Sequence, residues 1–176
     1  MVETLSNSSK ELTETKQKRD ADQAQLTKVN SQLQTNKNDL QVHQKQLADF
    51  QEKEISKIAG NSARAARERF RALGRTYFHW AKKEPHLFNL MFGDFCSLEK
   101  SPQNQREENR AFVNLTKCLD ELYEFDLISD KMRPFGELLS WSAVHGATSL
   151  IIGGHLEVED FETTLDAVEL ALGIKG

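Results

Sequence analysis

The sequence predicts an all-α fold, in which a compact helical domain follows a long coiled-coil-like helix. Two observations predict this class. Apolar residues recur at spacings of three and four across residues 62–172, which is typical of amphipathic helices, and no stretch shows sustained two-residue alternation. Residues 9–54 contain no glycine or proline and carry a leucine repeat. We therefore divide the 176-residue chain into a leucine-repeat helix, 1–57, and a helical domain, 58–176.

The first segment follows a seven-residue repeat, the spacing at which coiled-coil helices meet. Leucine occupies one core position except at Arg19, whereas the second position is mostly polar and includes Asn36 and His43, so the seam is weak. A solitary helix that gains order only beside a partner is the alternative. The predicted seam consists of Leu26, Val29, Leu33, Leu40, Leu47 and Phe50.

The first helix of the domain begins at Asn61 or Ser62, either of which can cap it, and ends before Pro85, whose ring and missing amide interrupt helices. One of its faces is apolar. A second face carries four arginines, which we interpret as a solvated surface partly paired with acidic residues. These are Arg64, Arg67, Arg71 and Arg75.

The remaining elements are expected in the following order. A short apolar helix at 85–92 has proline in its first turn and glycine after its last. A polar loop at 96–109 precedes an amphipathic helix at 109–128. The helix at 135–152 is apolar almost all round, which predicts burial on most sides, and the last helix, at 157–174, has acidic residues in its first turn.

Composition limits the location and the partners. The net charge of −4 gives no support to a uniformly basic chain that coats nucleic acid. Cys96 and Cys118 form no paired framework, which favours reduced thiols in the cytosol. The apolar run at 141–156 is shorter than the roughly 20 residues that cross a bilayer, and residues 1–12 lack the pattern of a signal peptide. We expect a cytoplasmic protein without a membrane segment.

Two stretches resemble a known family. They are "FRALGRTYFHWAKKEPHLFNLMFGDF" and "WSAVHGATSLIIGGHL", the second of which contains Trp141, His145 and Gly146. Their order and spacing resemble the C-terminal regulatory domain of TetR-like transcriptional regulators, in the subgroup with a Trp, His and Gly signature. The resemblance covers roughly residues 62–176. It implies a small-molecule pocket in the core and a dimer interface formed by the last two long helices.

The N-terminal segment departs from this family. Its full-length members begin with a helix-turn-helix domain of about fifty residues, which places a helix in the major groove. Here the leucine repeat occupies that place, without the apolar core that such a domain needs. We expect no direct DNA binding from this chain. A native extension, a fusion and an altered gene start all remain open.

The expected pocket is aromatic, and its ligand is expected to be a small hydrophobic effector. Trp141 and His145 lie one helical turn apart and share a face. His145 bonded to a neighbour in the core, and aromatic rings that merely fill the core, are the alternatives. Ligand sites are mostly lined by aromatic and apolar groups. The predicted ligand-binding residues are Tyr77, Phe88, Phe92, Phe112, Trp141 and His145.

Self-association is the simplest way to cover a helix that is apolar on both faces. Small residues at spacings of three and four in 135–152 would let another helix approach closely. We therefore expect a homodimer. The predicted interface comprises Ser140, Ala143, Ala147, Leu150, Ile151, Phe161, Leu165 and Val168.

Catalytic and metal-binding patterns are lacking in the sequence. No serine or cysteine has a recognisable base and orienting group, and no glycine-rich phosphate loop occurs. His79 and His86 are separated by Pro85, unlike metal ligands that share one helical face, and His155 is expected to face solvent. We expect no enzyme, no cofactor and no metal.

The sequence therefore favours a ligand-sensing, dimerising regulatory domain of TetR-like type without a recognisable DNA-binding head. The alternative is a coiled-coil adaptor or structural protein, whose leucine repeat binds a partner. Asn36 and His43 at core positions fit that alternative, because buried polar groups penalise mismatched pairings.

Overall fold

The computed structural model describes residues 2–92 and 110–174, whose regular structure is entirely helical. This confirms the predicted all-α fold class. The chain forms two compact units, Met1–Gln41 and Val42–Gly176. The predicted loop at 96–109 and Gly93 lie outside the described residues. No helix in the described part of the chain is long and apolar enough to cross a membrane.

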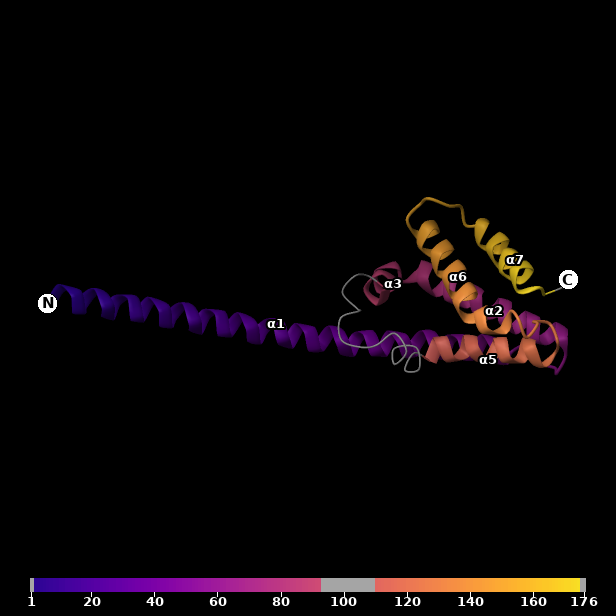
Figure 1. The fold of residues 1–176 in the computed structure, drawn as a ribbon, viewed down its shortest axis with the longest axis horizontal. Coiled ribbons are helices and arrows are strands. Elements are labelled where there is room, and N and C mark those ends of the chain that lie inside the picture. Colours follow the sequence, from indigo (N-terminus) through magenta and orange to yellow (C-terminus); the bar gives the residue numbers. More distant parts are fainter. Residues whose placement is uncertain (1, 93–109, 175–176) are drawn as a thin grey trace. The chain divides into compact units, whose positions relative to one another are not determined.

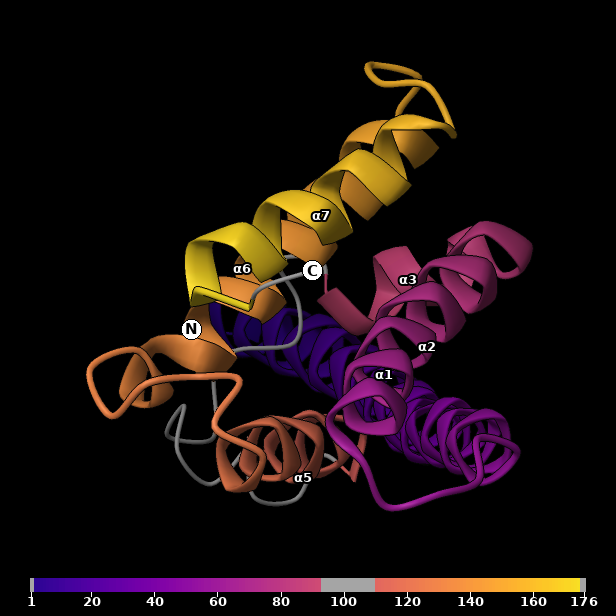
Figure 2. The same cartoon turned by 90° about the vertical axis from the view of Figure 1, so that its right-hand side faces the viewer.

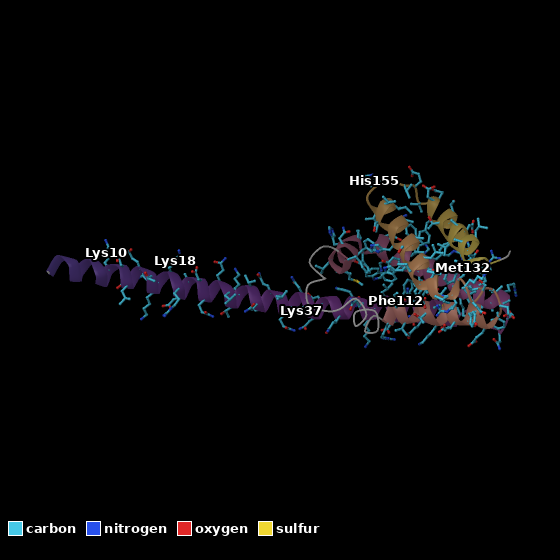
Figure 3. The ribbon with its side chains drawn as sticks, viewed as in Figure 1. Lys10, Lys18, Lys37, Phe112, Met132 and His155 are labelled. Carbon is cyan, nitrogen blue, oxygen red and sulfur yellow. The ribbon has the colours of Figure 1, made fainter. Side chains whose placement is uncertain are left out.

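Helix α1 runs from Val2 to Ser56 without interruption (Figure 1). The absence of glycine and proline explains its continuity. Within the first unit, Lys10 and Lys18 project into solvent (Figure 3). The predicted seam residues Leu26, Val29 and Leu33 are about half exposed, so this apolar line is uncovered in the single chain. The side chain of Leu40 lies outside the described residues.

The last turns of α1 belong to the globular unit. Leu47 and Ala48 are completely buried and Gln51 is almost so, whereas Phe50 remains exposed. Leu47 therefore packs inside its own chain, although the sequence placed it on the coiled-coil seam. The globular unit begins at Val42, inside the segment that we assigned to the leucine repeat. The seven-residue spacing of leucines continues to Leu47, but Leu47 packs against the globular unit and not against a second helix of a coiled coil.

Polar contacts join this part of α1 to helix α5 (Arg110–Glu124). The buried Asn114 side chain donates to the Ala48 carbonyl and to Oε1 of Gln51, each at 3.4 Å. At the surface, Arg110 donates to Asp49 and to Glu52, each at 2.8 Å. The amide contacts satisfy groups that burial removes from water.

Helix α2 (Ala63–Lys83) begins as predicted at Ser62, whose Oγ accepts the Ala65 N–H at 3.2 Å. Arg69 fixes the turn that precedes this helix, because Nη1 donates to the carbonyls of Ile58 and Gly60 at 2.8 and 3.1 Å. The same guanidinium pairs with Glu121 of α5. One side chain thus ties the turn to the core helices.

The globular unit continues with α3 (Pro85–Phe92), the 3₁₀ turn η2 (Arg133–Phe135), α6 (Gly136–Ile152) and α7 (Asp160–Leu172). Helices α6 and α7 lie side by side and run in opposite directions (Figure 2). Gly173 ends α7 in the left-handed conformation, with φ of 80°.

The core lies between α2, α5, α6 and α7. A Cβ on Gly74 of α2 would lie 2.8 Å from Cδ2 of Leu165, so glycine leaves room for the Leu165 side chain of α7 here. One turn further along α2, Phe78 stacks on Phe161 of α7 with ring centroids 4.2 Å apart. Residues of the larger buried cluster include Phe70, Leu73, Leu115, Cys118, Leu119, Leu122, Val168 and Leu172.

Ion pairs connect the arginine face of α2 to α7. The pairs are Arg67 with Glu169, Arg71 with Glu162, Asp166 and Glu169, and Arg75 with Glu162. Hydrogen bonds from Arg75 and Arg71 lower the pKa of Glu162 to about 2. The sequence indicated a solvated arginine face that is only partly paired. In the structure, three of its four arginines form ion pairs with α7, because acidic residues at 162, 166 and 169 lie on the side of α7 that faces them.

Candidate functional site

A cavity of about 40 Å³ lies inside the globular unit, among α1, α2, α5, α6 and α7. Of the six predicted ligand-binding residues, Tyr77, Trp141 and His145 line it. Tyr77 comes from α2, and the other two lie one turn apart on α6. The shared face expected for Trp141 and His145 is therefore present: their ring planes differ by only 5°, with centroids 6.2 Å apart.

The three other predicted residues belong to the same aromatic cluster but do not line the cavity. Phe88 and Phe92 of α3 pack on His145 with ring centroids 5.2 and 4.8 Å apart, and Phe112 of α5 lies 5.9 Å from Trp141. These rings pack against Trp141 and His145 without lining the cavity themselves. They restrict the orientations of these two side chains.

Tyr77 and His145 form a polar pair at the cavity. The Tyr77 hydroxyl and Nδ1 of His145 are 2.8 Å apart, within hydrogen-bonding distance. Burial lowers the pKa of His145 and raises the pKa of Tyr77 well above its usual range. Both shifts favour the uncharged forms near neutral pH. The pair therefore adds hydrogen-bonding capacity to the cavity without adding charge.

The remaining lining side chains with polar atoms are Gln51, Ser140 and Trp141, and no charged side chain of the described residues lines this cavity. A volume of about 40 Å³ holds about three water molecules, or a molecule of a few heavy atoms. Drug-sized ligands occupy pockets of roughly 300 Å³ or more. A larger ligand would require the surrounding side chains to move.

The sequence did not indicate several lining residues. Gln51 is one, because it lies in a polar segment where no pattern distinguishes it from its neighbours. Ser140 is another, because its small side chain pointed to a helix contact. The others follow from the apolar faces of their helices and are Phe70, Leu73, Gly74, Ala111, Leu115, Val144 and Leu165.

A comparison with family models identifies the domain. The model described as "Tetracyclin repressor-like, C-terminal domain" matches residues 70–172, which is more than half of the chain. The chain belongs to this family. The match confirms the resemblance that the Trp141, His145 and Gly146 signature indicated, and it covers every cavity-lining residue except Gln51 of α1. No curated protein and no solved structure matches the chain closely enough to add a relative.

Several residues of this TetR-like domain that the sequence assigned to a dimer interface are buried within the single chain. Phe161, Leu165 and Val168 of α7 are each 2% exposed, and Ser140 and Ala147 of α6 are also buried. They pack against α2 and the core of their own chain. The apolar stripe of α7 that the sequence revealed is its intramolecular face.

The outward faces of α6 and α7 consist of other residues. Of the predicted interface, Leu150 is exposed, whereas Ala143 and Ile151 are half-buried. Gly146 adjoins open space. The outward residues of α6 are Leu138, Ser142, Gly146 and Leu150. Those of α7 away from the ion pairs are Thr163, Ala167, Leu170 and Ala171.

Metal-binding geometry is lacking in the described ranges, where no three His, Cys, Asp or Glu residues are placed to hold an ion. His155 is exposed at the turn between α6 and α7 (Figure 3).

Cys118 is buried, and desolvation raises the pKa of its thiol to about 12. The thiolate is therefore scarce at neutral pH, and Cys118 behaves as a small apolar residue, while Cys96 lies outside the described residues.

Proposed function

We propose that this chain is a non-enzymatic, ligand-sensing and dimerising regulatory domain of a TetR-like regulator. The observation that carries the proposal is the cavity with aromatic walls in a domain of this family. Aromatic and apolar walls with a few polar groups are typical of small-molecule sites. The effector is a small, mainly hydrophobic molecule that contacts Tyr77, Trp141 and His145.

Helix α1 supplies a route by which a ligand could be sensed. Gln51 lines the cavity and is held by Asn114, while Leu47 anchors the same part of α1 in the core. A ligand that displaces the Gln51 side chain would change how residues 42–56 pack. A ligand shifts such an equilibrium only by its differential affinity for the two arrangements.

Ligand binding is tested by thermal unfolding with a panel of uncharged hydrophobic metabolites. A compound that binds only the folded state at one hundred times its Kd stabilises it by about 2.7 kcal/mol. The stabilisation should weaken in Trp141→Leu, which removes an aromatic wall. It should persist in Tyr123→Leu, which changes an aromatic residue remote from the cavity. Equal responses in the two variants would argue against this cavity.

The homodimer that we propose uses the outward faces of α6 and α7. The eight residues named for these faces are uncharged, on a chain in which 28% of residues are charged, while Asp160 adjoins Thr163 and Ala167 on the same side of α7. Leu170 is 80% exposed and Leu150 is 45% exposed, so both offer apolar area to a second copy. Uncharged, apolar faces on monomers are typical of interaction sites. Two such helices from each copy would pack as a four-helix bundle.

Light scattering at micromolar concentration tests this interface. Leu150→Glu and Leu170→Glu should each convert the dimer to a monomer, because a carboxylate would be buried without a partner. Leu90→Glu on α3 is the matched control, since Leu90 is 43% exposed and lies outside both faces. A dimer that persists in both α6 and α7 variants would contradict the assignment.

Two further features support a regulatory role without direct contact to DNA by this chain. The α2 arginines Arg67, Arg71 and Arg75 pair with acids of α7, so they do not form an open cationic strip for phosphates. The matched family covers 70–172 and therefore starts beyond α1. We also propose a cytoplasmic location. The support is that Cys96 and Cys118 form no disulfide pattern in the sequence, which favours a reducing compartment.

A second candidate function, a coiled-coil adaptor, is favoured by one observation. Leu26, Val29 and Leu33 form an uncovered apolar line on the first unit. Removal of residues 1–41 distinguishes the two functions, because the cavity lies entirely in the other unit. Retained ligand-induced stabilisation favours sensing, whereas loss of all partner binding without any ligand response favours the adaptor.

A further inference from the structure

Ser140 carries a buried hydroxyl that is left without a hydrogen-bond partner. The residue is 3% exposed, and its Oγ is unpaired in the part of the chain that the structure describes. Neighbouring buried hydroxyls behave differently: Thr148 donates to the Val144 carbonyl and Thr76 to the Ala72 carbonyl, each at 2.7 Å. Ser140 makes no such contact with its own helix, and it is one of the residues that line the cavity.

An unpaired buried hydroxyl is unfavourable, because it has lost its water and gained nothing in return. The cavity beside Ser140 has room for a small partner of about 40 Å³. Two other polar groups at the cavity already have partners within the chain, since Tyr77 pairs with His145 and Oε1 of Gln51 accepts from Asn114. Ser140 differs from them, because its buried hydroxyl would gain its first hydrogen bond from a ligand.

The wall also determines the charge of the ligand. No described lining side chain is charged, and burial keeps His145 in its neutral form at neutral pH. A carboxylate or an ammonium group would lose its hydration here without meeting an opposite charge. An uncharged amide or hydroxyl loses much less, and it can both donate to and accept from Ser140.

We propose that the cavity binds an uncharged small molecule whose amide or hydroxyl group hydrogen-bonds to Ser140 Oγ, while its apolar part packs against Trp141 and Tyr77. This rests on the proposed ligand-sensing function and adds the chemical class of the ligand. Anionic ligands of the same shape are excluded by the wall.

Isobutyramide and isobutyrate test the charge, because they share one shape and heavy-atom count and differ in charge near neutral pH. The full chain is titrated with each at pH 7.5, and the indole N–H of Trp141 is followed by NMR, with Trp80→Phe used to assign it. Isobutyramide should shift this resonance in a saturable way. Isobutyrate should bind at least tenfold more weakly. Equal or tighter binding of the anion would overturn the proposal.

Ser140→Ala tests the hydrogen bond. Isobutyramide should bind about tenfold more weakly to this variant, while its melting temperature stays equal to or above that of the wild type, because an unpaired hydroxyl has been removed. Ser56→Ala, at the exposed end of α1 and outside both the cavity and the proposed dimer faces, is the control and should change neither quantity. A lower melting temperature for Ser140→Ala together with unchanged isobutyramide binding would show that Ser140 serves the fold only.

The outcomes also separate this inference from the function on which it rests. A hydrophobic metabolite that stabilises the wild type and Ser140→Ala equally would overturn the role of Ser140 and leave ligand sensing intact. Failure of isobutyramide and of every metabolite to bind the wild type would overturn both.

Discussion

At the scale of single residues, the Tyr77–His145 pair defines the chemistry of the cavity. The two side chains come from α2 and α6 and meet at 2.8 Å, enclosed by Phe88, Phe92 and Trp141. Because burial lowers the pKa of His145, the folded domain binds its proton less readily than the unfolded chain does. The pair therefore links the stability of the fold to pH.

We expect this linkage to appear below the ordinary His145 pKa of 6.5. Above pH 6.5, His145 is neutral in both the folded and the unfolded chain, so its protonation does not reduce the free energy of unfolding. As the pH falls through 6.5, His145 binds a proton more readily in the unfolded chain, and the folded state loses stability. Urea unfolding from pH 8 to 5.5 should show this loss reduced in His145→Gln. His155→Gln, at an exposed site, should retain the wild-type profile. Identical profiles for wild type and His145→Gln would contradict the prediction.

At the scale of elements, α2 and α7 contact each other through apolar side chains and ion pairs. Leu165 reaches Gly74, Phe161 stacks on Phe78, and Arg71 pairs with three acids of α7. The Arg71 side chain is 12% exposed and that of Glu169 is 4% exposed, so this pair is largely removed from water. Removing one partner of a buried pair leaves an uncompensated charge.

Arg71→Met should destabilise the domain by about 2 kcal/mol, less than the loss of an isolated buried pair, because Arg67 still holds Glu169. Arg64→Met, at an exposed position of the same helix, should change stability by less than about 0.5 kcal/mol. Urea denaturation of the two variants measures the difference. Equal stability of the variants would show that the network does not stabilise the α2–α7 contact.

The helices themselves were predictable, because periodic apolar faces, Ser62 and Pro85 determine them locally. The partner of each face was not. The stripe that contains Phe161 and Leu165 indicated burial, but a periodic stripe does not distinguish burial in the same chain from burial against a second copy. For the same reason the leucine repeat continued to Leu47, which packs inside the globular unit. Tyr77, Trp141 and His145 were found from the aromatic pattern, whereas Gln51 depends on a contact distant in sequence.

At the scale of the whole molecule, the position of the unit boundary determines which fragments fold. The globular unit starts at Val42, and residues 42–56 contribute Leu47, Ala48 and Gln51 to its interior. A boundary placed by composition alone, after residue 57, would remove these side chains and expose the α5 surface on which they pack.

A fragment of residues 42–176 should therefore unfold cooperatively with nearly the stability of the globular unit in the full chain. A fragment of residues 58–176 should be less stable by at least the roughly 2–5 kcal/mol that truncation of one buried leucine costs. Differential scanning calorimetry compares them. In the longer fragment, Leu47→Ala should reproduce much of this loss. Equal stability of both fragments would show that α1 is not part of the core.

The burial of Cys118 has a practical consequence. Since its sulfur is shielded by α2 and α5 and its thiolate is scarce, alkylating reagents such as maleimides reach it only when those helices separate. In a Cys96→Ser background, the labelling rate of Cys118 thus reports how often the domain opens. An effector that stabilises the closed domain should lower the labelling rate of Cys118. This rate therefore serves as a binding assay that does not require the natural regulatory target to be known.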